Sequence, residues 1–279
     1  MKVTDFVAVS VVGTAHPWHP FKGLIRGACV AAALLALGAC QSATLGGYGS
    51  NVDGLAPMDS TQNTLLSAAH EAEAANKYDV AANAYGRLHE RRPQDAEILT
   101  AFIRTMRYSG NAADVVGYVE TKTQHLMDNP QVKFEYAKAL LAAGQKDKAL
   151  ATLYDVAALM GDNWQVHSAI GVTRDALGQF PQAIAAYGSA LRLSPNNVVV
   201  MNNMAMSQAM SGQLGTAIAT LERAAAINRS NTHVRQNLAL LYAVNGEVDK
   251  ARTLSAMDLE NADIETNLSF YRRFEGAAK

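Results

Sequence analysis

The chain has 279 residues, of which 49% are hydrophobic and 18% are charged, and its formal net charge is −1. A nearly neutral chain of this kind is not typical of a nucleic-acid-binding protein, so no nucleic-acid partner is expected. On length alone it would form one large domain or two modest ones.

The first notable segment is the apolar run LIRGACVAAALLALGACQ, residues 24–41. Its uncharged part, from Gly27 to Ala39, is 13 residues long, whereas a membrane-spanning helix needs about 20. Lys22 and Arg26 precede the apolar core and small residues follow it, which is the order of a secretory signal. The segment therefore predicts an export signal, with residues 1–39 forming the leader and signal peptide.

The tetrapeptide Leu37-Gly38-Ala39-Cys40 resembles the lipobox of bacterial lipoproteins, in which the cysteine is diacylated and becomes the new N-terminus. The resemblance implies lipid attachment at Cys40. The alternative is an ordinary signal peptide that happens to contain a cysteine. Cys29, the only other cysteine, would be removed with the signal, so no free thiol would remain in an oxidising compartment.

Cys40 is followed by Gln41 and by a segment rich in glycine and serine, QSATLGGYGSNVDGLAP. This composition is typical of a flexible linker, so residues 40–61 are expected to be a lipidated tether. By resemblance to bacterial lipoproteins that have no aspartate after the cysteine, Gln41 implies sorting to the outer membrane, with the protein facing the periplasm.

An internal repeat of 34 residues follows the linker. Six blocks align without insertion or deletion; they are 62–95, 96–129, 130–163, 164–197, 198–231 and 232–265. Position 15 of the blocks is occupied by Asn76, Gly110, Gly144, Gly178, Gly212 and Gly246. Glycine, and asparagine after it, best tolerates the left-handed conformation that ends a helix. Each block is therefore predicted to be a helical hairpin that turns at position 15.

Other positions of the repeat agree with a hairpin. Small residues recur at positions 8 and 20, where two helices could approach closely, and larger apolar residues recur at positions 7 and 24. Pro93 and Pro195 are placed to end the second helix of their blocks. After the sixth block, Ile264, Leu268 and Tyr271 form a helical stripe, so residues 266–279 are expected to be a capping helix and tail.

The pattern resembles the tetratricopeptide repeat, and residues 163–196, NWQVHSAIGVTRDALGQFPQAIAAYGSALRLSPN, match it best. The resemblance implies an all-α, right-handed solenoid of about six helical hairpins. Blocks two and three depart from the signature, for example with Ile103 at position 8 and Lys122 at position 27.

In the tetratricopeptide family, the groove that binds partners is lined by positions 2, 5, 6, 9, 12 and 13 of each block. Carried over to this sequence, these positions give a basic zone with aromatic residues, consisting of Arg104, Arg107, Tyr108, Phe134 and Lys138. They also give an amide and thioether zone, consisting of Asn202, Asn203, Met206, Met210, Gln236, Asn237 and Leu240. Amides can pair with a peptide backbone and thioethers fill irregular gaps, so the second zone is expected to bind an extended peptide.

Alternatives remain at both zones. The cations of the basic zone could instead form a solvated face paired with neighbouring acidic residues. Met206 and Met210 are expected to be exposed in the groove, but methionines at helical spacing can also be core residues.

No catalytic motif is present, because the sequence lacks H-E-x-x-H, G-x-S-x-G and a phosphate-binding glycine loop. The protein is therefore not expected to be an enzyme, to use a cofactor or to bind a metal.

The sixth block and its continuation, VRQNLALLYAVNGEVDKARTLSAMDLENADIETNLSFYRRF, look like the C-terminal portion of TadD-type lipoproteins of tight-adherence (Tad/Flp) pilus systems. The resemblance lies in residues 235–240, the Gly246 turn, Asp258-Leu259, Asn267 and Tyr271-Arg272. It implies an outer-membrane scaffold that supports secretin assembly or pilus export and binds proteins of that machine. The alternative is a generic envelope lipoprotein that scaffolds cell-wall enzymes or other outer-membrane complexes.

Overall fold

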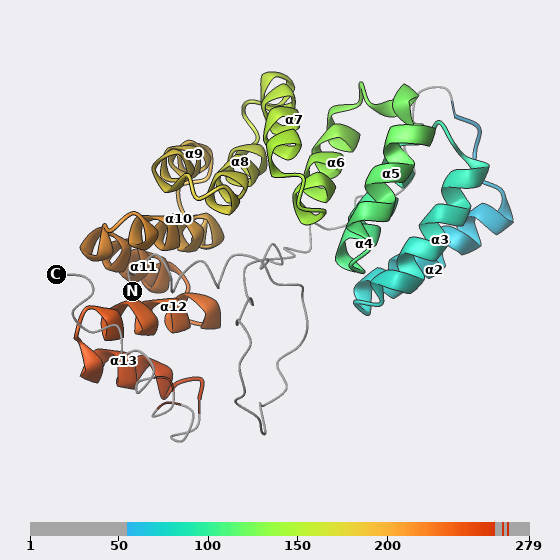
Figure 1. The fold of residues 1–279 in the computed structure, drawn as a ribbon. Coiled ribbons are helices and arrows are strands. Elements are labelled where there is room, and N and C mark those ends of the chain that lie inside the picture. The colour runs from blue at the N-terminus through green and yellow to red at the C-terminus, as the bar shows by residue number, and fades with distance from the viewer. Residues whose placement is uncertain (1–54, 260–263, 265–266, 268–279) are drawn as a thin grey trace, which may run out of the picture. The chain divides into compact units, whose positions relative to one another are not determined.

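The computed structural model describes residues 55–259, together with residues 264 and 267. Within these residues there are twelve α-helices, one 3-10 helix and no strand (Figure 1). They belong to two compact units, which we call the N-terminal unit (residues 55–161) and the C-terminal unit (from residue 162).

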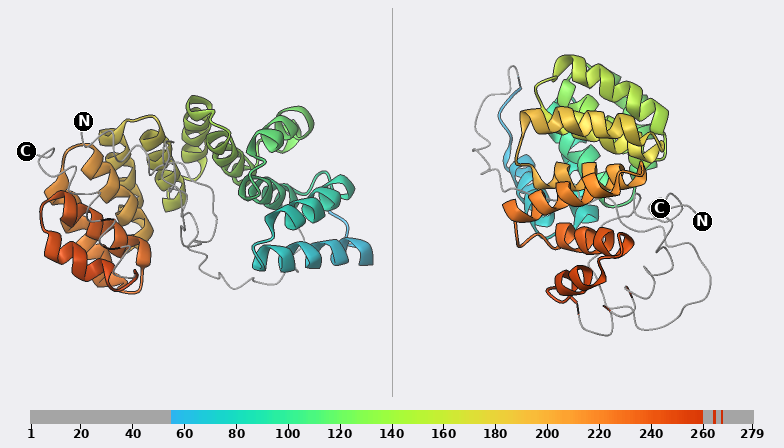
Figure 2. Two further views of the ribbon diagram at one scale, coloured as in Figure 1. Left: turned by 60° about the horizontal axis from the view of Figure 1, so that its bottom comes forward. Right: turned by 90° about the vertical axis from the view of Figure 1, so that its left-hand side faces the viewer.

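Each unit consists of three helical hairpins. In the N-terminal unit the paired helices are α2 (Ser60–Ala74) and α3 (Tyr78–Arg91), α4 (Ala96–Tyr108) and α5 (Ala112–Lys122), and α6 (Pro130–Ala142) and α7 (Lys146–Leu159). A 3-10 helix, η2 (Gln124–Leu126), follows α5. In the C-terminal unit they are α8 (Trp164–Ala176) and α9 (Phe180–Leu193), α10 (Val198–Met210) and α11 (Leu214–Ile227), and α12 (Thr232–Val244) and α13 (Val248–Ser255). The two helices of a hairpin lie side by side, as α2 with α3 and α12 with α13 show (Figure 2).

All six residues at position 15 have positive φ. Asn76 has φ of 54°, and the five glycines at this position have values between Gly178 at 72° and Gly110 at 86°. The turn after α8 shows the geometry, because Gln179 N–H donates to the carbonyl of Arg174 at 2.9 Å, which satisfies a carbonyl at the end of the helix. The hairpin turns therefore fall where the 34-residue period predicts them, and the all-α fold of tetratricopeptide-type hairpins is confirmed.

The first helix of every hairpin begins after an aspartate or asparagine whose side chain accepts a backbone N–H of the first turn. These N-cap residues are Asp59, Asp95, Asn129, Asn163, Asn197 and Asn231. Such caps stabilise a helix by about 1 kcal/mol each. From Asp95 onward they recur every 34 residues, whereas Asp59 starts α2 at Ser60, two residues before the predicted block.

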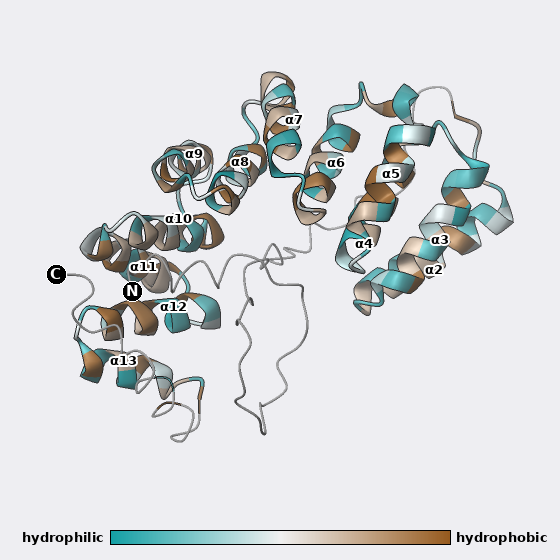
Figure 3. Ribbon diagram, viewed as in Figure 1, coloured by the Kyte–Doolittle hydropathy of each residue, from teal (hydrophilic) through white to brown (hydrophobic). Residues whose placement is uncertain are grey.

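The hairpins pack through small residues at positions 8 and 20. Ala69, Ala137, Ala205, Ala81, Ala149, Ala183, Ala217 and Ala251 are all fully buried. Helices α8 and α9 approach each other very closely at Gly171, because a Cβ built on this residue would lie 2.5 Å from Cε1 of Tyr187. Hydrophobic and hydrophilic segments alternate along most helices, as expected when one side of a helix faces a core (Figure 3).

The second block keeps its hairpin despite its departures from the signature. Ile103, which replaces the small residue at position 8, is fully buried in a cluster with Val115, Val119 and Leu140. The turn residue Gly110 still has positive φ. The register of this block is therefore the one that the period predicts.

Carboxylates join neighbouring hairpins within each unit. Tyr136 of α6 donates its hydroxyl to Glu120 of α5 at 2.8 Å, and Tyr242 of α12 donates to Glu222 of α11 at 2.6 Å. Glu120 and Glu222 share position 25 of their blocks. A bond between helices of successive hairpins adds to the interface on which repeat proteins depend for stability.

Ile264 is helical, 2% exposed and packed in the core cluster of the C-terminal unit, with Leu238 and Ala251. It is the only member of the predicted C-terminal stripe that the structure describes. Leu268, Tyr271 and nearly all of the predicted capping segment, like residues 1–39 and most of the linker, lie outside the described residues.

Replacing Gly178 or Gly212 with valine is expected to lower the free energy of unfolding of the C-terminal unit by about 1 to 3 kcal/mol. A Cβ at either position would meet no atom within 4 Å, so the cost would come from forcing a β-branched residue to positive φ. Urea unfolding measures the change. Gly215→Ala, at a helical glycine with equally open surroundings, is the control and should not destabilise. Equal midpoints for all variants would contradict the turn assignment.

Candidate functional site: two faces of the first helices

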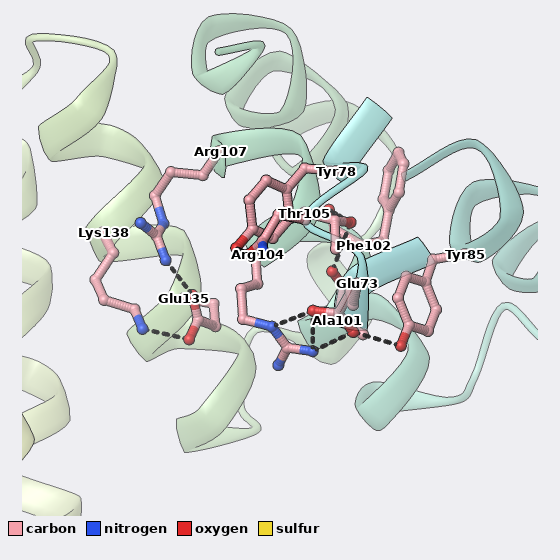
Figure 4. A network of polar contacts seen from close by, with 11 residues as sticks. Glu73, Tyr78, Tyr85, Ala101, Phe102, Arg104, Thr105, Arg107, Glu135 and Lys138 are labelled. Carbon is pink, nitrogen blue, oxygen red and sulfur yellow. Dashed lines mark hydrogen bonds and ion pairs between the residues drawn. The ribbon is translucent and has the colours of Figure 1, made fainter. Parts of the chain in front are cut away.

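The predicted basic zone lies on α4 and α6, the first helices of the second and third hairpins, which pack against each other. Its cations are Arg104, Arg107 and Lys138, and the structure brings each of them next to a carboxylate. We call these three cations and their acidic partners, Glu73 and Glu135, the cation cluster (Figure 4).

Arg104 makes a bidentate ion pair with Glu73 of α2. Its Nε and Nη2 donate to Glu73 Oε1 at 3.1 and 3.0 Å, and Nη2 lies 3.0 Å from Oε2 as well. The hydroxyl of Tyr85, from α3, donates to the same Oε2 at 2.7 Å. Glu73 thus joins three helices of two hairpins (Figure 4).

Glu135 of α6 lies between Arg107 and Lys138. Lys138 donates to Glu135 Oε1, whereas Arg107 Nη2 is 3.5 Å from Oε2 and not aligned for a hydrogen bond. The guanidinium of Arg107 lies over the Tyr108 ring at 4.1 Å, and Nζ of Lys138 lies 4.6 Å from the centre of the Phe134 ring. Every residue of the predicted basic zone is therefore part of this cluster or stacked on it.

These contacts bear on the two interpretations of the basic zone, a partner-binding surface or a solvated face paired with acidic residues. All three cations are paired with acidic residues, as the second interpretation proposed. They are not simply solvated, because the side chains of Arg107 and Glu135 are only 3% and 9% exposed. Burial lowers the pKa of Lys138; Glu135 opposes this effect, and Arg107 and Arg104 add to it.

The amide residues of the second zone lie together on α10 and α12. Asn237 Nδ2 donates to Asn202 Oδ1 at 2.8 Å, and Asn202 Nδ2 lies 3.4 Å from Asn203 Oδ1. Asn202 is buried, whereas Asn203, Gln236 and Asn237 are partly exposed. We call Asn202, Asn203, Gln236 and Asn237 the amide face.

The thioether residues of this zone are placed differently from the prediction. Met206 and Met210 are 4% and 5% exposed and form an apolar cluster against which Phe180 and Leu240 pack. The prediction that both methionines are exposed in the groove is therefore wrong. Nearly every side of α10 is buried, and Met206 and Met210 pack against Phe180 and Leu240 rather than being free to contact a partner.

A third polar group, which was not predicted from the sequence, joins α8 to α9 and α10. Asp175 Oδ2 accepts the hydroxyl of Tyr187 at 2.8 Å, and Ser207 Oγ lies 2.7 and 2.8 Å from the two carboxylate oxygens. Asp175 and Tyr187 are twelve residues apart, as are Glu73 and Tyr85, and both pairs occupy positions 12 and 24 of their blocks. That recurring pair is the sequence signal that would have identified both groups.

The C-terminal unit is expected to lose about 1 kcal/mol of stability between pH 5 and pH 7.5 through Asp175. Burial raises the pKa of Asp175 to about 6, although hydrogen bonds from Ser207 and Tyr187 oppose the shift. Because the folded pKa is above that of the unfolded chain, the contribution is present at low pH and lost as the pH rises through 6. Urea midpoints of the wild type and Asp175→Asn at both pH values measure it. A wild type that changes no more than the variant would exclude Asp175 as the source.

Cys40 lies outside the described residues. Within residues 55–259, no helix is both long and apolar enough to cross a bilayer. The same search region holds no group of three or more histidine, cysteine, aspartate or glutamate side chains that could bind a metal.

Comparisons with known proteins agree with the repeat architecture. Residues 208–263 match the profile of a family described as Tetratricopeptide repeat. No curated protein matches the chain. The profile match and the hairpin geometry support a tetratricopeptide-repeat protein, a class that typically acts as a scaffold for protein–protein interactions.

Three solved structures to which the chain is similar have low sequence identity to it. A thermophilic TPR protein in Thermus thermophilus is 18% identical, with 76% of this chain and 99% of that chain covered and a TM-score of 0.49. A MamA protein from Desulfovibrio magneticus RS-1 is 14% identical, with 65% and 97% covered and a TM-score of 0.49. Another MamA crystal structure is 18% identical, with 62% and 94% covered and a TM-score of 0.48.

Proposed function

We propose that the protein is an outer-membrane lipoprotein, anchored through Cys40 and facing the periplasm, that holds protein partners during assembly of a Tad/Flp-type pilus machine. The resemblance of residues 234–274 to TadD-type lipoproteins supports the pilus system, and the lipobox supports the anchor. The secretin of that machine is the partner that we propose.

The observation that carries a binding function is the amide face. Asn203 and Asn237 occupy position 6 on neighbouring first helices, and both are partly exposed. Asn202 Oδ1 accepts a hydrogen bond from Asn237 Nδ2, and Asn202 Nδ2 approaches Asn203 Oδ1. These contacts leave the Nδ2 donor of Asn203 and the Oδ1 acceptor of Asn237 for a ligand. A donor and an acceptor side by side match the C=O and N–H groups of an extended peptide.

Deletion of the gene is expected to abolish Tad-type pili and surface adherence, with pilin still made and processed but the secretin scarce or unassembled. Complementation tests the residues. Wild type should restore piliation, whereas Cys40→Ser should not, because the lipid anchor would be missing. Asn203→Ala with Asn237→Ala should weaken partner binding by about 1 to 3 kcal/mol and reduce piliation.

Asn83→Ala with Asn196→Ala is the matched control, because both residues are exposed and lie outside the amide face. Each variant is checked for normal abundance and helicity. Full piliation with the Asn203/Asn237 variant would contradict the amide face as the binding surface. Normal pili in the deletion strain would exclude the pilus function and favour a generic envelope scaffold. Charged substitutions at Met206 and Met210 are unsuitable here, because these buried residues would report folding instead of binding.

A further inference from the structure

The cation cluster has an excess of positive charge. Arg104, Arg107 and Lys138 are paired only with Glu73 and Glu135 among the described residues. Glu73 also accepts the hydroxyl of Tyr85. Three cations therefore share two carboxylates.

Arg107 is the least satisfied of the three cations. Its Nε and Nη2 are buried and make no hydrogen bond within residues 55–259, and Glu135 Oε2 is likewise without one. Leaving a buried polar group without a partner costs free energy, and more so for a charged group. A single carboxylate, Glu135, thus compensates Arg107 and Lys138 incompletely.

Aromatic rings hold two of the cations in place without neutralising them. Arg107 lies over Tyr108 and Lys138 over Phe134. A cation–π contact orients the charge while leaving it able to attract an anion. The lowered pKa of Lys138, caused first by burial and then by the neighbouring arginines against the effect of Glu135, is consistent with this excess of positive charge.

Two of the cations remain accessible. The side chains of Arg104 and Lys138 are 34% and 18% exposed. They share position 9 on α4 and α6, two packed helices whose axes are typically about 8 to 10 Å apart. Alternate side chains of an extended peptide lie on one face about 7 Å apart. Because the side chains of Arg104 and Lys138 are long and flexible, each can reach one of two such carboxylates.

We propose that the cation cluster docks the side-chain carboxylates of an extended acidic segment of a partner protein. This deepens the proposed scaffold function and rests on it only in requiring a protein partner. Carboxylates of the partner, bound to Arg104 and Lys138, would supply the missing negative charge. Because they would lie close to Arg107, they would also stabilise its buried positive charge. The N-terminal unit would then select acidic segments, whereas the uncharged amide face of the C-terminal unit would not.

The test uses the full chain in mild detergent and a fluorescein-labelled, C-terminally amidated peptide with glutamate at three alternate positions and alanine between them. Anisotropy at low salt should give binding at least about tenfold tighter than for the same peptide with glutamine in place of glutamate. Lys138→Gln and Arg104→Gln should each weaken binding about tenfold. Lys138→Arg, which keeps the charge, and Lys133→Gln, which removes a charge from α6 outside the cluster, should stay within about threefold of wild type. Affinity should fall as salt increases.

Several results would overturn the proposal. One is that the glutamate peptide binds no more tightly than the glutamine peptide. Another is that Lys133→Gln and Lys138→Gln lose affinity for the glutamate peptide equally. Equal binding of a glutamine peptide with a free C-terminus would assign the site to a terminal carboxylate instead. Because Arg104 is partly exposed, its variant keeps the test informative if Lys138→Gln does not fold. A failed titration would leave the piliation experiment unaffected, so the two proposals fail separately.

Discussion

Replacing Glu135 with leucine is expected to lower the free energy of unfolding of the N-terminal unit by about 3 to 5 kcal/mol, the usual cost of breaking a buried ion pair. Glu135 is the only carboxylate next to Arg107 and Lys138 among the described residues. Without it, two adjacent and largely buried cations would repel each other with no opposite charge between them. Urea unfolding followed by circular dichroism measures the loss, and hydrogen exchange of residues 55–161 places it in this unit.

Two further variants separate charge from packing. Glu71→Leu removes an exposed carboxylate of α2 and should change stability by no more than about 0.5 kcal/mol. Replacing Glu135, Arg107 and Lys138 together with leucine should recover much of the loss, because no buried charge would remain. If Glu135→Leu unfolds at the wild-type urea concentration, the cations are hydrated and the cluster is not a buried network.

Replacing Gly171 with valine is expected to destabilise the C-terminal unit by about 3 kcal/mol, at the upper end of the usual cost of overpacking. A Cβ at this position would lie 2.5 to 2.7 Å from three ring atoms of Tyr187. The ring cannot easily move aside, because it is 1% exposed and its hydroxyl is bonded to Asp175. The helices α8 and α9 would therefore have to separate.

The urea midpoint of Gly171→Val measures this effect, and Gly188→Ala is its control, because a Cβ at Gly188 would meet nothing within 4 Å. The control should be neutral or slightly stabilising, since alanine favours helix over glycine. Adding Tyr187→Leu to Gly171→Val should relieve the clash and make the two changes non-additive. Additive losses would mean that the valine is accommodated elsewhere.

The hairpin fold could be predicted because its main determinants are local. A left-handed turn requires glycine or asparagine whatever surrounds it, so Asn76 and Gly178 mark helix ends in the sequence itself. The N-cap residues carry an equally local signal, and attention to Asp59 would have placed the start of α2 correctly.

The polar networks could not be predicted in the same way, because they depend on which helices become neighbours. Glu73 and Arg104 are 31 residues apart, and their pairing follows from the packing of α3 against α4 and of α2 against α3. The burial of Met206 could not be predicted from the sequence pattern either. Residues 198–210 are apolar around most of the helix, so periodicity does not distinguish a free face from a buried one.

The carboxylate bonds between hairpins make the repeats of this chain non-interchangeable modules. Removing residues 198–231 would keep the 34-residue period and every turn glycine outside that block. Asp175 would then face Leu241 in place of Ser207 and lose that hydrogen bond. Tyr242 would face Gly188 in place of Glu222 and lose its hydrogen bond as well. A chain shortened by one repeat would keep the 34-residue period but would lose the hydrogen bonds between the hairpins that become neighbours. Insertion or loss of whole repeats, an easy evolutionary step for many solenoids, is therefore restricted in this one.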